Sequence, residues 1–318
     1  MMYNSFLSIV SVLQTPGEFR QLPQLLEQLY SVLEQHFSDF EIVLVNNTQG
    51  HSVDSFLQPL PGSIKQHIHL LNLAASTNKN HAIIAGLDRA NGDYTVIFEP
   101  IFADQSQLVI ELFRKAQQGF DIVYLRARER KVSLTYRFFY AIFYFLLRHY
   151  SSLKVDDRAH NTRIISRRAL NSLLRLRENL RYMKAIYSIV GYHTSAIEVD
   201  KPLRMDPEEN FSERFRTSLV AITSFTSFLR SLLLWIFILS FLFLIGVIIN
   251  ALLVKFTGSD ILGVPQEAVS GWTFLVILIS IFFAVTFLNL YIMSIYLSNI
   301  YYEIKQRPLY IIESVKRY

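Results

Sequence analysis

Cysteine is absent from this chain of 318 residues. A protein without cysteine has neither disulfides nor thiolate metal ligands. A disulfide-stapled scaffold and a zinc–thiolate site are therefore both excluded. The absence of cysteine suits a reducing cytoplasm.

A strong excess of positive charge is missing as well. The chain has 31 Lys and Arg against 26 Asp and Glu, which gives a net charge of +5. No recognised nucleic-acid-binding motif accompanies this charge, so we expect no nucleic-acid partner. Attraction to anionic lipid headgroups accounts for a charge of this size.

Charge of either sign is absent from two long runs near the C-terminus, Ser231–Val254 and Ala268–Tyr302. A helix of about 20 apolar residues crosses the hydrocarbon core of a bilayer, and backbone polar groups in lipid must be satisfied within helices or closed barrels. The sequence therefore predicts transmembrane helices over 231–254 and 268–300, joined by an outer hairpin over 255–267.

The flanks of these runs predict their orientation. The hairpin 255–267 has one lysine against two acids, whereas the tail 301–318 has four basic residues, and Arg214, Arg216 and Arg230 precede the first run. Basic residues stay on the cytoplasmic side of a membrane. We therefore expect both termini to be cytoplasmic.

The first 205 residues alternate strand-like apolar runs with amphipathic helical segments. Phe6–Leu13 and Glu41–Val45 have the length and composition of buried strands, and Glu18–His36 between them has leucines at helical spacing. The alternation continues to about residue 125 and predicts an α/β domain over 1–205, with a parallel sheet covered on both faces.

Ligands of such sheets bind beyond the carboxyl ends of the strands. In this chain, that rule points to the surroundings of Gln14, Asn47 and Glu99. These three residues are the first candidates for a binding site.

An aromatic segment with arginines near its ends, Tyr136–Tyr150, follows the expected sheet. It is too short to span a bilayer, and its composition suits a helix in the headgroup plane. A helix packed on the sheet is the alternative. Phe211–Arg230 is a second amphipathic candidate, and residues 206–230 are expected to form a juxtamembrane helix.

Five further segments stand out when the chain is taken in order: Ala85–Asp93, Gly119–Tyr124, Arg163–Arg168, Glu178–Gly191 and Ile304–Ile312. Together with the two uncharged runs, they resemble the family-2 glycosyltransferases that act on polyprenyl phosphate, and the resemblance covers almost the whole chain. That group includes dolichyl-phosphate mannose synthase and the bacterial undecaprenyl-phosphate glucosyl- and aminoarabinosyl-transferases.

This resemblance implies a GT-A, Rossmann-like fold at the cytoplasmic face of a bacterial-type inner (plasma) membrane. There a sugar passes from a nucleotide sugar to a lipid phosphate, usually with Mg²⁺ or Mn²⁺.

The chain departs from the family at nearly every acidic motif position. The family's metal motif, Asp-x-Asp-Leu-Gln-Asp, is replaced by Glu99-Pro100-Ile101-Phe102-Ala103-Asp104. Its other acidic motifs are replaced by Ser11, Gln14 and Thr15 after the first strand, by Asn47-Thr48-Gln49 after the second, and by His160-Asn161-Thr162-Arg163 further on.

These departures affect catalysis more than binding. Ile101 and Ala103 provide no side-chain oxygen for a hard cation, which leaves only Glu99 and Asp104 as weak candidate ligands. Asn161 cannot act as a base. We therefore treat Glu99, Ile101 and Asn161 as altered catalytic positions and expect no metal cofactor.

The resemblance assigns the remaining candidates to binding. Nucleotide binding falls to Gln14, Asn47, Lys79 and Glu99. Phosphate binding falls to Arg163, Arg181 and Lys184. The alternative is that the basic residues are surface charges near anionic lipid.

Two functional hypotheses follow. In the first, the chain is a membrane-anchored family-2 glycosyltransferase homologue of the polyprenyl-phosphate sugar-transfer pathway, and the usual metal-dependent site is lost or strongly altered. In the second, it is an active transferase that uses a nucleotide sugar through a non-standard or metal-independent site. Residue chemistry favours loss of the usual mechanism. The expected partners are membrane lipid, polyprenyl phosphate and nucleotide sugar. A homo-oligomer and a partner glycosyltransferase both stay open.

Overall fold

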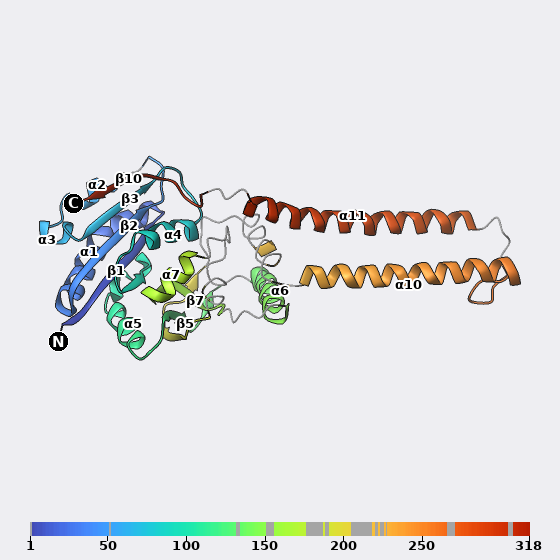
Figure 1. Cartoon of the computed structure of the whole chain (residues 1–318), viewed down its shortest axis with the longest axis horizontal. Coiled ribbons are helices and arrows are strands. Elements are labelled where there is room, and N and C mark those ends of the chain that lie inside the picture. The colour runs from blue at the N-terminus through green and yellow to red at the C-terminus, as the bar shows by residue number, and fades with distance from the viewer. Residues whose placement is uncertain are drawn as a thin grey trace.

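An α/β domain and two long helices make up the fold of this protein in a computed structural model (Figure 1). The structure describes residues 2–50, 52–131, 134–150, 156–175, 187, 191–204, 218–219, 222, 226, 228–265, 271–304 and 308–318. The long helices extend from one end of the α/β domain, and the N-terminus lies at the opposite end.

The centre of the domain is an eight-stranded sheet with the order β10-β3-β2-β1-β4-β7-β5-β8. Its strands are β1 (Tyr3–Leu13), β2 (Phe37–Asn46), β3 (Ile68–Leu73), β4 (Tyr94–Ile97), β5 (Ile122–Ala127), β7 (Ala159–Ser166), β8 (Thr194–Val199) and β10 (Ile312–Arg317). A separate two-stranded sheet pairs β6 (Arg130–Lys131) with β9 (Leu203–Arg204).

The prediction of a parallel sheet is wrong for two strands. β7 runs antiparallel to β4 and β5, and β10 runs antiparallel to β3. Each of these strands follows a helix at the end of the domain where the other strands finish. The chain therefore returns from the carboxyl edge, and the returning strand must run the opposite way. The predicted strands β1 to β4 are parallel where they pair with one another.

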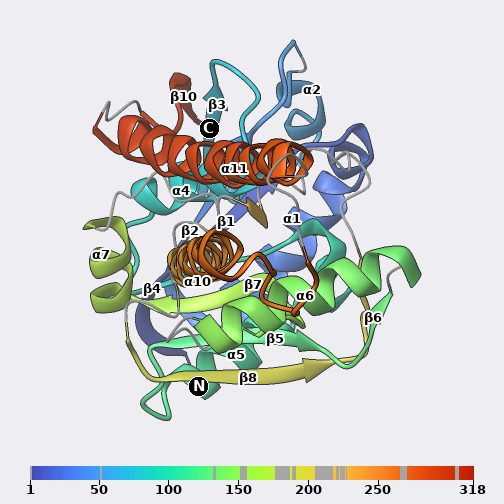
Figure 2. The same ribbon diagram turned by 90° about the vertical axis from the view of Figure 1, so that its right-hand side faces the viewer.

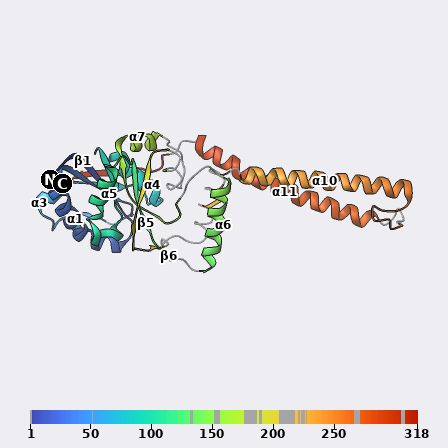
Figure 3. The same ribbon diagram turned by 90° about the horizontal axis from the view of Figure 1, so that it is seen from below.

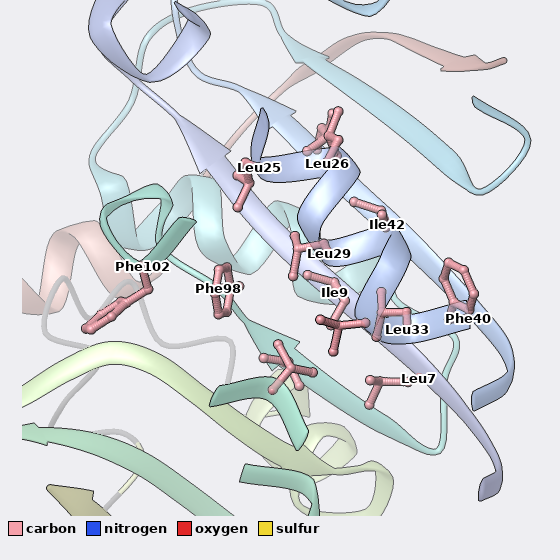
Figure 4. Close-up of a cluster of buried hydrophobic side chains, with 14 of the residues drawn as sticks. Leu7, Ile9, Leu25, Leu26, Leu29, Leu33, Phe40, Ile42, Phe98 and Phe102 are labelled. Atoms are coloured by element: carbon pink, nitrogen blue, oxygen red, sulfur yellow. The ribbon is translucent and has the colours of Figure 1, made fainter. Parts of the chain in front are cut away.

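Helices cover both faces of the sheet. One face packs against α1 (Pro16–His36), α2 (Asp54–Leu57), α3 (Gly62–Lys65), the 3-10 helix η1 (Pro100–Gln105) and α5 (Leu108–Ala116). The other face packs against α4 (Lys79–Arg89) and α7 (Arg167–Arg175). Figure 4 shows the first of these layers, in which leucines of α1 meet the apolar side chains of β1 and β2. The leucines of α1, which recur at helical spacing as expected, thus form its buried face.

Helix α4 approaches the sheet closely because residue 86 is a glycine. A Cβ atom there would lie 2.3 Å from Val10 Cγ1 and 3.0 Å from Val45 Cγ2, so even alanine would force the helix away. The close approach fixes how the first residue of α4, Lys79, is presented at the edge of the sheet.

The C-terminal segment 308–318 returns to the sheet and adds β10 to the edge strand β3. Ala74 N donates to Ile311 O at 2.9 Å, and Tyr310 Oη donates to the Asp88 carboxylate of α4. Thr77 Oγ1 lies 3.4 Å from Leu309 O. The sequence predicted only a tail here. The structure shows that this tail covers the edge of the sheet.

The remaining helices are α6 (Leu134–Tyr150), α10 (Phe228–Thr257) and α11 (Gly271–Ile304). α10 and α11 lie side by side, and α6 runs across their direction between them and the sheet (Figures 2 and 3). The ring of Tyr150 contacts that of Phe228 at a centroid distance of 5.1 Å, which joins α6 to α10. Most of the expected juxtamembrane segment 206–230 lies outside the described residues.

Within the described residues, no helix is both long enough and apolar enough to cross a membrane.

The docked C-terminus generates a prediction on pH. Lys316 Nζ lies 2.5 Å from Asp54 Oδ2, and Tyr318 Oη donates to Asp54 Oδ1. Hydrogen bonds from Lys316, Tyr318 and Ser52 lower the pKa of Asp54 from 3.8 to about 2. Since the depressed pKa belongs to the folded state, the stabilisation is present above the unfolded value and is lost as pH falls toward about 2.

We therefore expect the backbone amides of β10 to lose hydrogen-exchange protection, corrected for intrinsic rates, between pH about 4 and about 2. Asp54→Asn should lower this protection already at neutral pH and remove the step. A step of equal size in Asp54→Asn would contradict the assignment to this carboxylate.

Candidate active site

Three of the sequence-predicted residues lie where parallel strands end. Gln14 follows β1, Asn47 follows β2, and Glu99 lies two residues beyond β4. Asn47 N donates to Leu13 O at 3.0 Å, which extends the ladder between β1 and β2 to this edge. Because β1 starts at the N-terminal end of the molecule, its carboxyl end points toward α10 and α11 (Figure 1).

Glu99 is the most heavily contacted of these residues, and its side chain is only 14% exposed. Lys79 Nζ lies 3.3 Å from its Oε1. Asn161 N and Thr162 N donate to its Oε2 at 2.9 and 3.2 Å, and Asn161 Nδ2 donates to its Oε1 at 3.3 Å. Both carboxylate oxygens therefore already have donors from α4 and β7.

The protonation state of Glu99 follows from these contacts. Burial alone would raise its pKa, but the charges of Lys79 and His160 and the hydrogen bonds from Thr162 and Lys79 together lower the pKa below its ordinary value. Glu99 is thus an anion at neutral pH, and its charge is balanced by Lys79.

The second candidate ligand, Asp104, lies at the other end of the altered motif. Lys201 Nζ is 2.7 Å from Asp104 Oδ1 and also donates to the backbone oxygen of Ile101. This hydrogen bond from Lys201 lowers the pKa of Asp104. Between the two acids, the Ile101 side chain is 41% exposed, whereas Phe102 is fully buried in the core (Figure 4).

These residues do not fit a divalent cation. Each of the two remaining carboxylates is paired with a lysine, and Ile101 and Ala103 stand where the resemblance expects further oxygen ligands. Within the described residues there is no group of three or more His, Cys, Asp and Glu side chains that could hold a metal ion. A Mg²⁺ or Mn²⁺ ion would have to displace both ammonium groups.

Asn47 has a structural role at this edge. Its Nδ2 donates to Thr77 O at 2.7 Å, and its Oδ1 accepts from Thr77 N at 2.8 Å. The pair holds the segment that leads into α4 and Lys79. Gln14 is half-buried, and its backbone N–H donates to Glu18 Oε2 in the first turn of α1 at 2.7 Å. Nucleotide binding by Gln14 and Asn47 stays a prediction.

Arg163 is buried, with 3% of its surface exposed. Its guanidinium donates to His160 O at 2.7 Å and to Asn161 O at 3.1 Å, and it lies 3.8 Å from the centroid of the Tyr187 ring. Burial lowers the pKa of Arg163. Phosphate binding by Arg163 stays a prediction, and it requires Tyr187 to uncover the guanidinium. Arg181 and Lys184 lie outside the described residues.

Sequence reasoning missed Lys201, which lies between β8 and β9. The residues next to it, Asp200 and Pro202, belong to no apolar periodic pattern, and its partner Asp104 is 97 residues away. A local signal in the sequence is its place just after a strand, at Lys201-Pro202.

The basic segment before α6 is less available for binding anionic lipid than the sequence suggested. Arg126 pairs with Asp156 at 3.1 Å, and Arg128 pairs with Asp200 at 2.6 Å.

A mixed α/β sheet with a polar site at the carboxyl edge of β1, β2 and β4 defines a GT-A-like domain. Residues 19–174 match the family model described as Glycosyl transferase family 2. The chain therefore carries a domain of glycosyltransferase family 2.

The similar curated proteins are glycosyltransferases that match along most of their length. An uncharacterized glycosyltransferase of Synechocystis is 28% identical and covers 94% of this chain and 92% of its own. A prophage-derived bactoprenol glucosyl transferase of Shigella flexneri is 27% identical over 88% and 89% of the two chains. A prophage bactoprenol glucosyl transferase homolog of Escherichia coli is 25% identical over 88% and 90%.

Among solved structures, mannosyl-3-phosphoglycerate synthase from Rubrobacter xylanophilus is similar to this chain, with 11% identity and a TM-score of 0.42. The match covers 69% of this chain and 72% of the synthase.

The geometry of Asn47 generates a second prediction. Asn47→Asp, which restores the acidic residue implied by the resemblance, places a carboxylate oxygen against the carbonyl of Thr77 in place of the donor now 2.7 Å away. We expect a loss of about 1–3 kcal/mol in the free energy of unfolding, measured by denaturant titration. Asn171→Asp, on the exposed side of α7, is the matched control and should change little. Equal stability of both variants would mean that the Thr77 contacts contribute nothing.

Proposed function

We propose that this protein is a membrane-anchored glycosyltransferase of the polyprenyl-phosphate pathway in which the usual metal-dependent centre is strongly altered. It transfers a sugar from a nucleotide sugar to a polyprenyl phosphate without a divalent cation. The observation that carries the proposal is the pairing of Glu99 and Asp104 with Lys79 and Lys201. Relatives of nearly full length are named bactoprenol glucosyl transferases, which supports the lipid acceptor.

The acceptor's own chemistry explains why a missing base need not stop the reaction. A phosphate monoester has a second pKa of about 6, so its oxygens are anionic nucleophiles at neutral pH. One of these oxygens attacks the anomeric carbon, the bond from that carbon to the nucleotide diphosphate breaks, and the diphosphate leaves with the electron pair. No proton has to be removed from the acceptor, so an amide at Asn161 is compatible with transfer.

Membrane anchoring is supported by the sequence and exposure of the C-terminal helices. The uncharged run Ser231–Val254 lies within α10, and residues 271–302 of the second uncharged run lie within α11. Apolar side chains such as Trp235, Leu239 and Phe287 are exposed, and extended apolar surfaces of this kind mark membrane contacts. Phe139 and Phe145 expose further apolar surface on α6, which crosses the direction of the two helices. This arrangement favours α6 in the headgroup plane over a helix packed on the sheet.

A non-catalytic homologue is the second candidate. The observation that favours it is the engagement of Glu99, whose carboxylate is held by donors from Lys79, Asn161 and Thr162 and is withdrawn from substrate. Such a protein would bind polyprenyl phosphate or a partner glycosyltransferase without transferring sugar.

Transfer by the purified full chain distinguishes these candidates. We expect radiolabelled sugar from UDP-glucose, or from another nucleotide sugar of a panel, to pass to undecaprenyl phosphate in detergent with EDTA present. Mn²⁺ should change the rate less than about twofold, because no divalent ion takes part. Undecaprenol, which lacks the phosphate, is the matched acceptor control. If no donor gives a lipid-linked sugar with or without Mn²⁺ while undecaprenyl phosphate still binds, the non-catalytic candidate is correct.

The membrane topology can be tested separately by labelling single introduced cysteines. Because the chain has no cysteine of its own, no other residue of the protein reacts with a thiol reagent. Leu262, between α10 and α11, and Glu313, on β10, are both exposed. Basic residues flank the runs on the side of the α/β domain, so both termini should be cytoplasmic. Leu262→Cys should react with a membrane-impermeant thiol reagent in intact cells, and Glu313→Cys only after permeabilisation. The reverse pattern contradicts this orientation, and labelling of both positions in intact cells contradicts the anchoring.

A further inference from the structure

We propose that Lys201 and Lys79 form a clamp for the diphosphate of the donor, in which two ammonium groups supply the charge that a divalent cation supplies elsewhere. The inference rests on the proposed function and extends it to the residues that hold the leaving group. Lys201 belongs to none of the sequence motifs described above. It is identified by its contacts with the altered motif.

The two lysines contact the two ends of the altered motif. Lys79 reaches Glu99 at the start of the motif, and Lys201 reaches Ile101 O and Asp104 at its end. They come from α4 and from the segment after β8, which are far apart in the sequence but both reach the motif that follows β4. The motif is therefore paired with one ammonium group at each end, whereas a metal motif surrounds a single cation.

The charges of this arrangement match those of a metal site. Two carboxylates with two ammonium groups carry the same net charge as two carboxylates with one divalent ion. A diphosphate entering the site thus meets a similar balance of charge. The Lys201 ammonium group has three N–H donors, and Asp104 and the backbone oxygen of Ile101 accept two of them. Lysine binds phosphate as a point charge, which suits a leaving group whose negative charge grows as the sugar bond breaks.

The Lys201 side chain is ordered by contacts on several sides, whereas most lysine side chains extend into solvent. Its side chain is 25% exposed, and its Nζ lies 5.5 Å from the centroid of the buried Phe102 ring. His160 Nε2 donates to the backbone oxygen of Lys201 at 3.2 Å, and the His160 ring packs on Phe102 at 5.0 Å. Ordering a lysine costs side-chain entropy, and here these contacts order the Lys201 side chain before a ligand arrives.

The backbone around Lys201 is anchored on both sides. Arg128 N donates to Val199 O at 3.1 Å, and Leu203 N donates to Glu129 O at 3.1 Å. These bonds tie the segment 199–204 to the end of β5 and to β6. The position of Lys201 therefore follows from the sheet and does not depend on a free loop.

The clamp and a metal site predict opposite effects for the same substitution. Asp104 is 64% exposed, so Asp104→Asn should fold normally. If Asp104 is a metal ligand, its loss weakens diphosphate binding. If it only balances Lys201, its loss releases the ammonium group and strengthens binding. Affinity for inorganic pyrophosphate, measured by calorimetry on the full chain in detergent with EDTA, separates the two.

We expect the wild-type protein to bind pyrophosphate in EDTA and Asp104→Asn to bind it more tightly. Lys201→Met should lower the affinity by roughly tenfold or more, as expected when a charged hydrogen bond is lost, and Lys201→Arg should retain most of it. Lys115→Met is the matched control, because Lys115 also lies over a phenylalanine ring, Phe120, at 5.3 Å but belongs to α5. It should leave the affinity unchanged.

Lys79→Met alone would leave the Glu99 carboxylate without its cation, so the double variant Lys79→Met/Glu99→Gln is used. It should lose affinity for pyrophosphate, whereas Glu99→Gln alone should gain it. Melting temperatures near that of the wild type show that these changes report on binding and not on folding.

Several outcomes overturn the clamp: no binding of pyrophosphate by the wild type, a tenfold gain from Mn²⁺, weaker binding by Asp104→Asn, or equal effects of Lys201→Met and Lys115→Met. The proposed function fails separately. If UDP and GDP bind no more tightly than pyrophosphate and no sugar is transferred, the clamp stands without a nucleotide-sugar donor. If sugar is transferred in EDTA but Lys201→Met binds pyrophosphate like the wild type, the function stands without the clamp.

Discussion

The contact on which the site depends is the engagement of the largely buried Glu99 carboxylate with Lys79 and with the backbone of Asn161 and Thr162. It joins the end of β4 to α4 on one side and to the start of β7 on the other. A carboxylate in this position is costly unless its charge is balanced and its oxygens accept hydrogen bonds. Both conditions are met here, so the same contacts that permit the burial also fix the edge of the sheet where a ligand would bind.

This edge is held from further away by small features of packing. Gly86 lets α4 approach the sheet, which sets where Lys79 points, and Asn47 fixes the segment before the helix through Thr77. The C-terminal tail reaches the same segment at Thr77 and grips α4 through Tyr310 and Asp88. The residues after α11 and the candidate donor site therefore belong to one connected structure, although they are more than 200 residues apart in the chain.

Local patterns in the sequence predict local structure well here, and they fail where distant segments meet. Apolar periodicity locates β1, β2 and α1 to within a few residues, and the rule for strand ends brings Gln14, Asn47 and Glu99 to one edge. Three features depend on contacts between segments that are distant in the sequence, and a short stretch of sequence carries no information on such contacts. They are the antiparallel direction of β7, the docking of β10 and the pairing of Lys201 with Asp104. The burial of Arg163 was not predicted from the sequence for the same reason, because the ring that covers its guanidinium belongs to Tyr187, in a later segment.

The substitutions at the altered motif are best explained by charge. Replacing metal ligands with Ile101 and Ala103 in an otherwise unchanged site would leave the remaining acids uncompensated, and a diphosphate would be repelled. The structure instead pairs each remaining acid with a lysine, at 3.3 Å for Glu99 and 2.7 Å for Asp104. Such compensation restores the electrostatic balance that anion binding needs while removing the coordination that a metal needs. Lys201 lies between an aromatic ring, a backbone carbonyl and a carboxylate, and the proposed anion-binding role gives a physical reason for this placement.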